Sequence, residues 1–349
     1  MDEDIIRQMN IVKVVTIILN WNGMDDTLEC LESLYKMDYK NNFIIVVDNG
    51  SVDGSQYVIK QKYPSVHLIQ NQNNLGFAVG NNIGIDYALK MNPGYIWLLN
   101  NDTIVDRDTL TKLVDFMQGY PDIGCISPLI YYYDNRTEIQ FCGSYIDWKN
   151  KTIIKLDNAD QVTQKMSISL WGTALLIRRE VIETIGNLNE KYFAYHEDEE
   201  YSKRVLASGY KNMVHREARI YHKNSRSTGS NDAPLQVFLR SRNIYFLWMD
   251  NLKGIDWLKD VPKYIAHIIA YCGLLREKQL SESISASLDG MWHAFRGVGG
   301  PRNPEIKMPG PIKNVFKFMI SWHPYFWSSL LLGNVSDIFF QIKNKNKTI

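Results

Sequence analysis

The sequence predicts an α/β protein with a mostly parallel central sheet, followed by a mainly helical C-terminal extension. In the first hundred residues, short apolar, β-branched segments alternate with segments of helical periodicity, which is typical of a parallel sheet. The 349 residues suffice for about two domains, and 45% of them are hydrophobic, enough for a sizeable core. We therefore expect a first domain over residues 1–235 and a helical, basic region over residues 236–349.

The first predicted strand is Val12–Leu19, a nearly continuous β-branched run as expected of a buried parallel strand. A turn follows at Asn20-Trp21-Asn22-Gly23, and Asp26 with Glu29 gives a loose capping-box signal for the next helix. Further strands are expected at Phe43–Val47, Val66–Ile69 and Tyr95–Leu99, with helices opening at Asp53-Gly54-Ser55, over Gly76–Lys90 and near Thr103–Met117.

Composition excludes several classes of protein. The net charge is +1, so no overall basic field marks a nucleic-acid binder, and we expect no nucleic-acid partner. The four cysteines form no C-x-x-C pair and no zinc spacing, which fits a reducing compartment; they are Cys30, Cys125, Cys142 and Cys272. Residues 1–10 are acidic and have no apolar segment, so we expect no secretory signal there and a cytoplasmic protein.

Charge is unevenly distributed along the chain. From residue 251 onward there are thirteen Lys and Arg against seven Asp and Glu, a net of +6, together with four tryptophans, Trp257, Trp292, Trp322 and Trp327. A basic segment with scattered tryptophans favours contact with a membrane surface, and the alternative is a solvated helical appendage. The best apolar stretch, residues 315–340, is interrupted by Lys317, His323, Pro324 and Asp337, so it is not expected to span a bilayer.

Short polar side chains follow each of the four predicted strands, at Asn20-Trp21-Asn22, Asp48-Asn49, Asn73-Asn74 and Asn100-Asn101-Asp102. Ligands of open parallel sheets bind beyond the carboxyl ends of the strands, which predicts a site at this edge. The sequence has no dinucleotide-binding glycine motif and no P-loop, so phosphates would be held by a metal ion or by basic side chains. Asp102 is a candidate Mg²⁺ ligand, or alternatively the cap of the following helix.

These four segments, in this order and spacing, resemble a family 2 glycosyltransferase with the GT-A fold. Three later segments resemble the acceptor-side strand, the Glu-Asp motif and the late His strand of that family: Trp171–Arg179, Phe193–Glu200 and Ala218–His222. The resemblance covers about Val12–Arg242 and is greatest to rhamnosyltransferase-type enzymes of surface polysaccharide synthesis.

The resemblance implies a nucleotide pocket and a metal site. Asp48 would bind the base, and the other residues of the pocket would be Asn20, Asn22, Asn49, Asn74, Gly76 and Asn101. The D-x-D position of the family is Asn100-x-Asp102 here, so Asp102 would be the main charged ligand. His222 resembles a further ligand of the same ion, Mn²⁺ or Mg²⁺, next to the diphosphate.

The resemblance also implies catalytic and acceptor residues. Asp198 matches the general base and Glu197 is its partner, whereas Glu200 departs from the Glu-Asp-x-Asp pattern of the family. The alternative for these acids is a charged first turn of a helix. Trp171 would lie on the acceptor side, and Arg242 would contact a diphosphate or, alternatively, lie on a solvated helix face.

The predicted activity is an inverting sugar transfer from a nucleotide-diphosphate donor to a hydroxyl group of a polyprenyl-diphosphate-linked glycan. Subgroup resemblance favours dTDP-rhamnose over a UDP-hexose as donor. The helical, basic region 236–349 is expected to approach the inner face of the cell membrane. Two alternatives remain: a sugar nucleotidyltransferase, and a non-catalytic nucleotide-sugar-binding scaffold of the same fold.

Overall fold

The computed structural model describes residues 11–149, 151–156, 158, 168–223, 232–250 and 255–322. The chain divides into two compact units, Met1–Asp147 with Thr152–Gly229, and Trp148–Lys151 with Ser230–Ile349. The functional division at residue 235 stays a prediction. The expectations for residues 1–10, for Trp327 and for the apolar stretch beyond Trp322 lie outside the described residues.

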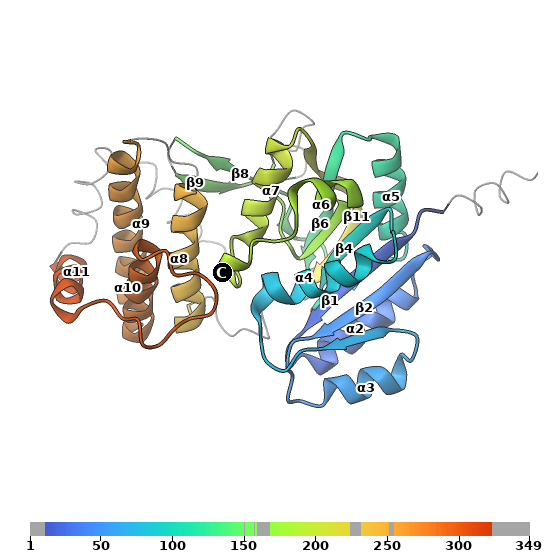
Figure 1. Cartoon of the computed structure of the whole chain (residues 1–349), viewed down its shortest axis with the longest axis horizontal. Helices are drawn as coiled ribbons and strands as arrows, with labels where there is room; N and C mark the ends of the chain where they lie inside the picture. The colour runs from blue at the N-terminus through green and yellow to red at the C-terminus, as the bar shows by residue number, and fades with distance from the viewer. Residues whose placement is uncertain are drawn as a thin grey trace, which may run out of the picture. The chain divides into compact units, whose positions relative to one another are not determined.

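The first unit is built on one large mixed sheet, in which β1, β2, β3 and β4 run parallel and β10 is antiparallel to both of its neighbours (Figure 1). The strands are ordered β3-β2-β1-β4-β10-β6-β11-β5, with β7 beside β6. Their bounds are β1 Val14–Asn20, β2 Asn42–Asp48, β3 His67–Gln70, β4 Tyr95–Asn100, β5 Thr103–Val105, β6 Ile123–Tyr132, β7 Ile139–Phe141, β10 Ala174–Arg178 and β11 Lys211–His222. A separate hairpin pairs β8 Ser144–Asp147 with β9 Thr152–Lys155.

Six helices and one short 3₁₀ turn belong to the described part of this unit. They are α2 Met24–Tyr35, α3 Ser55–Lys62, α4 Gly76–Leu89, α5 Thr109–Gly119, α6 Arg179–Ile185, α7 Glu197–Ala207 and the 3₁₀ turn Glu190–Tyr192. Helix α4 packs closely on β1 and β2, because a side chain at Gly84 would come within 2.6 Å of Ile17. The predicted α/β fold is confirmed.

The strand register brings the predicted polar ends together. β1 is parallel to both β2 and β4, and Asn20 aligns with Asp48 while Leu19 aligns with Asn100. Asp48 in turn aligns with Gln70 at the end of β3. Because parallel strands share their carboxyl edge, the four loops that follow these strands emerge on one side of the sheet.

Two local predictions are wrong. Helix α2 begins at Met24 with Gly23 at its N-cap, so Asp26 lies in the first helical turn and does not cap it. No helix follows Asp102 directly, because β5 intervenes and pairs with β11 before α5 starts at Thr109. Asp102 therefore does not cap a helix.

The described part of the second unit is mainly helical, as predicted, with α8 Pro234–Met249, α9 Trp257–Glu277, α10 Ser281–Phe295 and α11 Gly310–Trp322. Helices α8 and α10 meet closely, since a side chain at Gly290 would come within 2.4 Å of the Phe238 carbonyl oxygen. The residues described include no helix with the length and apolar character needed to cross a bilayer.

Candidate active site

Asn20 is the hub of a buried hydrogen-bond network at the end of β1. Its amide nitrogen donates to Asp48 Oδ1 at 2.8 Å and to Ser55 Oγ at 2.8 Å. Its carbonyl oxygen accepts from Thr27 Oγ1 at 2.9 Å. The side chain is fully buried. Asn20 therefore ties β1 to the loop after β2 and to α2, so it shapes the predicted pocket from behind.

Asp48 and Asn49 shape the next loop. Asp48 Oδ2 accepts a hydrogen bond from the backbone N–H of Ser51 at 3.1 Å, so the Asp48 side chain stabilises the turn that follows β2. The side-chain nitrogen of Asn49 donates to Asn74 Oδ1 at 3.0 Å and to the Gly76 carbonyl at 3.1 Å. The predicted nucleotide residues are thus brought together, and several of their polar atoms hold the loops of the pocket in place.

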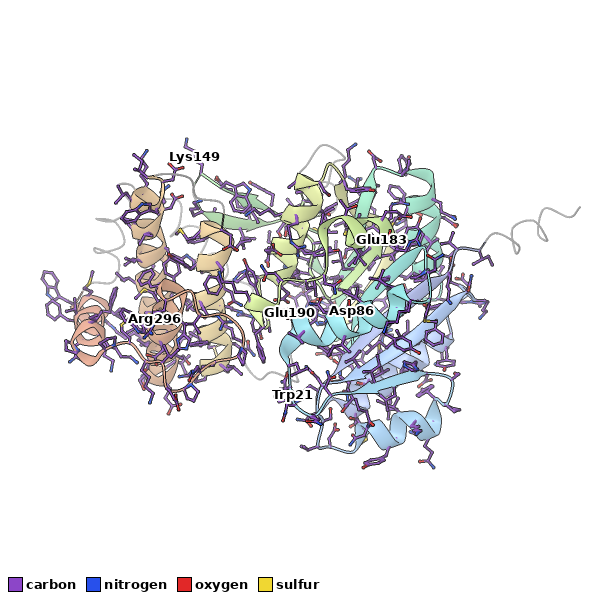
Figure 2. The ribbon with its side chains drawn as sticks, viewed as in Figure 1. Trp21, Asp86, Lys149, Glu183, Glu190 and Arg296 are labelled. Carbon is purple, nitrogen blue, oxygen red and sulfur yellow. The ribbon has the colours of Figure 1, made fainter. Side chains whose placement is uncertain are left out.

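Asn22 and Trp21 occupy the turn after β1, where Figure 2 labels Trp21. Asn22 is exposed and has a left-handed backbone, with φ of 51°. Its side-chain oxygen, Oδ1, accepts the backbone N–H of Val52 at 2.8 Å. Of the predicted nucleotide residues, Asn22 is thus the one with the most open side chain.

Asp102 and His222 meet at the end of the sheet. Asp102 Oδ1 lies 3.2 Å from His222 Nε2, and both side chains are almost fully buried. The other ring nitrogen of His222, Nδ1, lies 2.7 Å from Gln140 Oε1. Because Gln140 Oε1 can only accept, Nδ1 carries the proton in this contact, and a neutral ring would offer the Nε2 lone pair to a cation held together with Asp102.

This pair fits a divalent cation that also binds substrate. Among the described residues there is no group of three or more His, Cys, Asp or Glu side chains that could hold a metal. Two protein ligands are sufficient for Mg²⁺ where substrate phosphates and water complete the coordination. The neighbouring Asn101 also contacts α2, since its side-chain nitrogen donates to Thr27 Oγ1 at 3.0 Å.

Sequence reasoning missed Lys223, which follows His222 directly. Its ammonium group pairs with Asp26 Oδ1 at 2.6 Å and with Glu29 Oε2, both on α2. Burial alone would lower the pKa of Lys223, but these two hydrogen bonds outweigh it and the pKa is raised. The acidic residues at an i, i+3 spacing were the available signal, but the sequence cannot show that their partner lies almost 200 residues away.

Asp198 is held by two backbone donors at the start of α7. Oδ2 accepts the N–H of Gly172 at 2.9 Å and Oδ1 accepts the N–H of Glu199 at 2.9 Å. Burial, and then the charge of Glu199, raises the pKa of Asp198 well above its ordinary value. The predicted acidic first turn of a helix is therefore present, and its second residue is oriented by fixed donors.

Glu197 lies beside Asp198 and is buried. Burial, followed by the negative charge of Asp198, raises the pKa of Glu197 well above its ordinary value. Within the described part of the chain, Oε2 of Glu197 has no hydrogen-bond partner. A buried, unsatisfied carboxylate oxygen is costly, which is typical of functional rather than structural groups.

The segment before α7 is strained. Phe193, Tyr195 and His196 all have positive φ, of 65°, 70° and 71°, which non-glycine residues rarely adopt. The Phe193 carbonyl accepts the N–H of Phe77 at 2.6 Å in the first turn of α4. Gly76 has φ of +85°, and a side chain there would come within 2.5 Å of Phe193. The predicted nucleotide residue Gly76 thus also joins α4 to the loop before α7.

One short segment, Gly172-Thr173, links the strand end before Asp102 to the carboxylate of Asp198. Gly172 donates to Asp198, as above, and the next carbonyl, Thr173 O, accepts the N–H of Asn100 at 2.9 Å. Asn100 is two residues before Asp102 in the chain. Three regions far apart in sequence therefore converge at one place.

Trp171 adjoins this segment on its other side. Its ring stacks on Phe141 with centroids 4.0 Å apart, and Lys155 Nζ lies 5.8 Å from the ring centroid. The predicted acceptor-side residue is therefore one position away from the residue that binds Asp198.

Arg242 lies in the second unit and is fully buried. Its guanidinium group donates to Asn243 Oδ1 at 2.8 Å and to the Gly300 carbonyl at 2.6 Å. Burial lowers the pKa of Arg242 to about 10. The expectation of a solvated helix face is wrong, because α8 is enclosed by its neighbours. The diphosphate contact stays a prediction, and it would need the surrounding residues to move.

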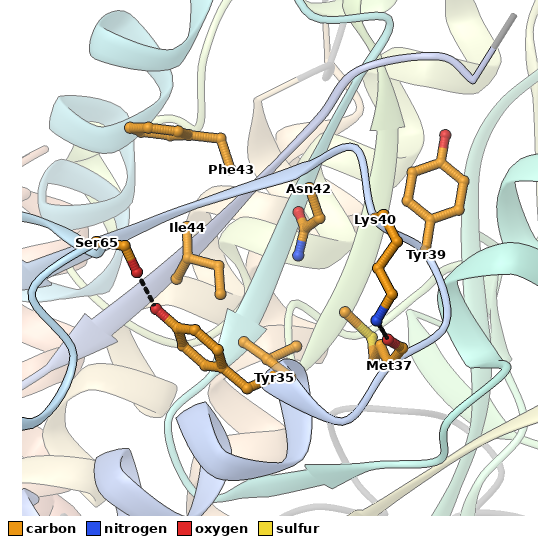
Figure 3. Close-up of a pocket in the computed structure, with 9 residues that line it drawn as sticks. Tyr35, Met37, Tyr39, Lys40, Asn42, Phe43, Ile44 and Ser65 are labelled. Carbon is orange, nitrogen blue, oxygen red and sulfur yellow. Dashed lines mark hydrogen bonds between the residues drawn. The ribbon is translucent and has the colours of Figure 1, made fainter. Parts of the chain in front are cut away.

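A cavity of about 490 Å³ lies elsewhere, between the end of α2 and the start of β2 (Figure 3). Tyr35, Lys40 and Phe43 are among its lining residues. Since β2 is seven residues long, this cavity is roughly 20 Å from the carboxyl edge of the sheet, and it plays no part in the site.

Comparisons with known proteins agree with this geometry. Residues 15–186 match the sequence model of Glycosyl transferase family 2. The chain is 24% identical over 233 residues to the N-acetylglucosaminyl-diphospho-decaprenol L-rhamnosyltransferase of Mycobacterium tuberculosis, covering 60% of this chain and 76% of that one. It is 23% identical over 300 residues to the dTDP-rhamnosyl transferase of Shigella flexneri, covering 82% and 97%.

Among solved structures, the fold is similar to that of a mannosyltransferase from Pyrobaculum calidifontis in complex with GDP-Man and Mn²⁺. The TM-score is 0.52 at 16% identity, covering 92% of this chain and 84% of that one. This similarity shows the fold alone, which is that of the GT-A class.

Proposed function

The chain carries a glycosyltransferase family 2 domain at residues 15–186, and on this premise we propose that it transfers a sugar, with inversion, from a nucleotide-diphosphate donor to a hydroxyl group of a lipid-linked glycan. One observation carries the proposal. The segment Gly172-Thr173 holds the carboxylate of Asp198 on one side and the strand end leading to Asp102 on the other. A proton acceptor and a phosphate-side metal pair are therefore neighbours.

Asp198 is the proposed general base. As the acceptor oxygen forms its bond to the anomeric carbon, the hydroxyl proton passes to the Asp198 carboxylate, and the bond from that carbon to the diphosphate oxygen breaks. The two backbone donors orient the carboxylate. Burial raises the pKa of Asp198, so its ionised carboxylate is a stronger base than that of an ordinary aspartate.

Glu197 would contribute charge when ionised. A sugar transfer of this kind passes through an oxocarbenium-like transition state, as glycoside hydrolysis does, and a nearby carboxylate stabilises it. The low dielectric around the buried Glu197 strengthens that interaction.

Asp102 and His222 would hold a divalent cation, Mn²⁺ or Mg²⁺, whose positive charge stabilises the leaving diphosphate. Gln140 keeps the His222 ring in place, and Lys223 anchors the strand end that carries it. The loops around Asp48 and Asn49 would receive the nucleoside.

We propose dTDP-rhamnose as the donor and a polyprenyl-diphosphate-linked glycan as the acceptor. The printed names of the two relatives support this choice, since one acts on a diphospho-decaprenol compound and the other is a dTDP-rhamnosyl transferase. An acceptor of this kind would bring the enzyme to the inner face of the cell membrane.

The test is thermal-shift binding of nucleotides and nucleotide sugars, with Mn²⁺ and with excess chelator. We expect dTDP-rhamnose with Mn²⁺ to raise the melting temperature by roughly 5 °C at saturating concentration, because a ligand of the folded state stabilises it by mass action. UDP-hexoses and GDP-mannose serve as competing donors in the same panel. Transfer is then measured on a polyprenyl-diphosphate-linked acceptor.

His222→Ala should abolish the Mn²⁺-dependent part of the shift. His215→Ala, on the same strand β11, is the matched control and should retain that part. No shift with any nucleotide in the presence of Mn²⁺ would contradict the proposal, and a larger shift with a UDP-hexose would replace the donor.

A further inference from the structure

Gln140 of β7 is buried, but only one end of its amide is hydrogen-bonded. The residue is 2% exposed, and its Oε1 lies 2.7 Å from Nδ1 of His222. Its other end, Nε2, has no hydrogen-bond partner in the part of the chain that the structure describes. An enclosed N–H without an acceptor lowers stability, and a methionine would fill a similar volume without that cost. The benefit of a glutamine at this position therefore comes from its oxygen.

His222 lies between two acceptors for one proton. A neutral imidazole carries hydrogen on a single ring nitrogen. Gln140 Oε1 accepts this hydrogen from Nδ1, whereas Asp102 Oδ1, which lies 3.2 Å from Nε2, would accept it from the other side of the ring. Only the first arrangement leaves the Nε2 lone pair available to a cation. A carboxylate is the stronger acceptor of the two, so without Gln140 the proton would move to Nε2.

Strand pairing fixes Gln140 beside the His222 ring. β7 pairs with β6 through Ile139 and Phe141, the two neighbours of Gln140 in the chain. β6 pairs in turn with β11, and directly after β6 the Tyr133 N–H donates to the His222 carbonyl at 3.1 Å. The backbone thus holds both partners of the 2.7 Å contact in one sheet, so the amide oxygen is a fixed acceptor.

We propose that Gln140 is a positioning residue, which keeps the proton of His222 on Nδ1 and so prepares Nε2 to bind a divalent cation beside Asp102. The use of that cation in sugar transfer rests on the proposed function, whereas the position of the proton can be observed without metal, nucleotide or turnover. Gln140 and His222 are 82 positions apart in the chain, so no local motif connects them. It follows that position 140 requires an acceptor oxygen and does not require the amide nitrogen.

Two variants of similar size test this requirement. Gln140→Glu retains an acceptor oxygen, and Gln140→Met has none. Long-range ¹H–¹⁵N NMR of the imidazole groups, without metal and at about pH 8, where an ordinary histidine is neutral, distinguishes the two tautomers. We expect Nδ1–H in the wild type and in Gln140→Glu, and Nε2–H in Gln140→Met. His222→Ala identifies the His222 signal among those of the seven histidines.

Mn²⁺ binding in the presence of dTDP, measured by electron paramagnetic resonance, is the second readout. Gln140→Met should weaken it about tenfold or more, as for other residues that orient a metal ligand, while Gln140→Glu should stay within about threefold of the wild type. Gln140→Met without ligand should not melt at a lower temperature, because an unsatisfied donor is removed. Gln56→Met is the matched control, because Gln56 of α3 also has a buried amide atom without a partner among the described residues. It should leave the His222 tautomer and Mn²⁺ binding unchanged.

Three results would overturn the proposal. The first is Nε2–H on His222 in the wild type, and the second is Nδ1–H retained in Gln140→Met. The third is an equal weakening of Mn²⁺ binding in Gln140→Met and Gln140→Glu, which would show that the acceptor oxygen is not what matters. If the wild type binds no Mn²⁺ but the proton moves as expected in Gln140→Met, the proposed cation site fails and the positioning of the proton by Gln140 is confirmed.

Discussion

The nucleotide side and the catalytic side of the candidate site use their polar atoms differently. On the nucleotide side, Asn20 and Asn49 hydrogen-bond through both ends of their amides to neighbouring loops. On the catalytic side, Glu197 retains an oxygen without a partner among the described residues, and the preceding loop contains three strained positions. On the nucleotide side the polar groups hold the loops in a fixed shape. On the catalytic side the unsatisfied oxygen and the strained backbone lower the stability of the fold.

This contrast teaches that a motif residue can serve a site without touching its ligand. Asn20 belongs to the motif by which the pocket is recognised, yet it is fully buried behind the pocket. Substitutions on the two sides should therefore affect different measurements, activity on the catalytic side and stability on the nucleotide side.

The largest effect is expected for Asp198→Asn. An amide cannot accept the hydroxyl proton, so transfer should fall about a thousandfold, in the range for loss of a general base. The nucleotide dissociation constant should change less than twofold. Rates are measured by product formation and binding by calorimetry, and unchanged turnover would remove Asp198 from the mechanism.

The next effect is on stability. Asn20→Ala removes a buried amide and leaves Asp48, Ser55 and Thr27 without one partner each, so we expect a loss of about 3 kcal/mol in the free energy of unfolding. Urea denaturation measures it. Asn22→Ala, exposed in the same turn, is the control and should cost less than about 1 kcal/mol. Equal losses in both variants would break the contrast between buried and open motif residues.

A smaller effect, on Mn²⁺ binding, should show whether Lys223 positions the proposed ligand His222. Lys223→Met leaves Asp26 and Glu29 without their cation and loosens the strand end next to His222. We expect about tenfold weaker Mn²⁺ binding in the presence of dTDP, by electron paramagnetic resonance, as for other outer-shell partners. Lys36→Met removes an exposed pair with Glu32 on the same helix and should leave Mn²⁺ binding unchanged. If Lys223→Met also leaves it unchanged, Lys223 has only a structural role.

The smallest effect is a pH-dependent gain in stability. The pKa of Glu197 is higher in the folded protein than in the unfolded chain. Glu197 therefore favours folding at pH values below its pKa in the unfolded chain. This stabilisation is lost as the pH rises through its pKa in the folded protein. Glu197→Gln should therefore raise the melting temperature at pH 8 by about 2–4 °C, with little change at pH 4. The exposed Glu183→Gln is the control. A gain of equal size at both pH values would show that ionisation of Glu197 is not its cause.

Much of the first unit could be predicted from the sequence. The continuous apolar runs predict β1, β2 and β4 within two residues at each end, because parallel strands buried on both faces consist almost entirely of apolar residues. The family motif led to Asp198 and to the Asp102 and His222 pair. The capping role given to Asp26 was wrong, because α2 begins at Met24 and Asp26 lies in its first turn. Its carboxylate pairs instead with Lys223, which no local pattern predicts.

The sequence by itself determined the α/β class, the edge of the sheet where polar loops gather, and the residue types able to do the chemistry, because each depends on neighbours in the chain. Only the tertiary structure decided which of those residues are open and which are enclosed. Arg242 and Lys223 both carry one positive charge, yet Arg242 is enclosed by α8 and its neighbours, while Lys223 joins the end of β11 to α2. The physical reason is that burial and ion pairing are set by residues far away in sequence, brought together only when the core packs.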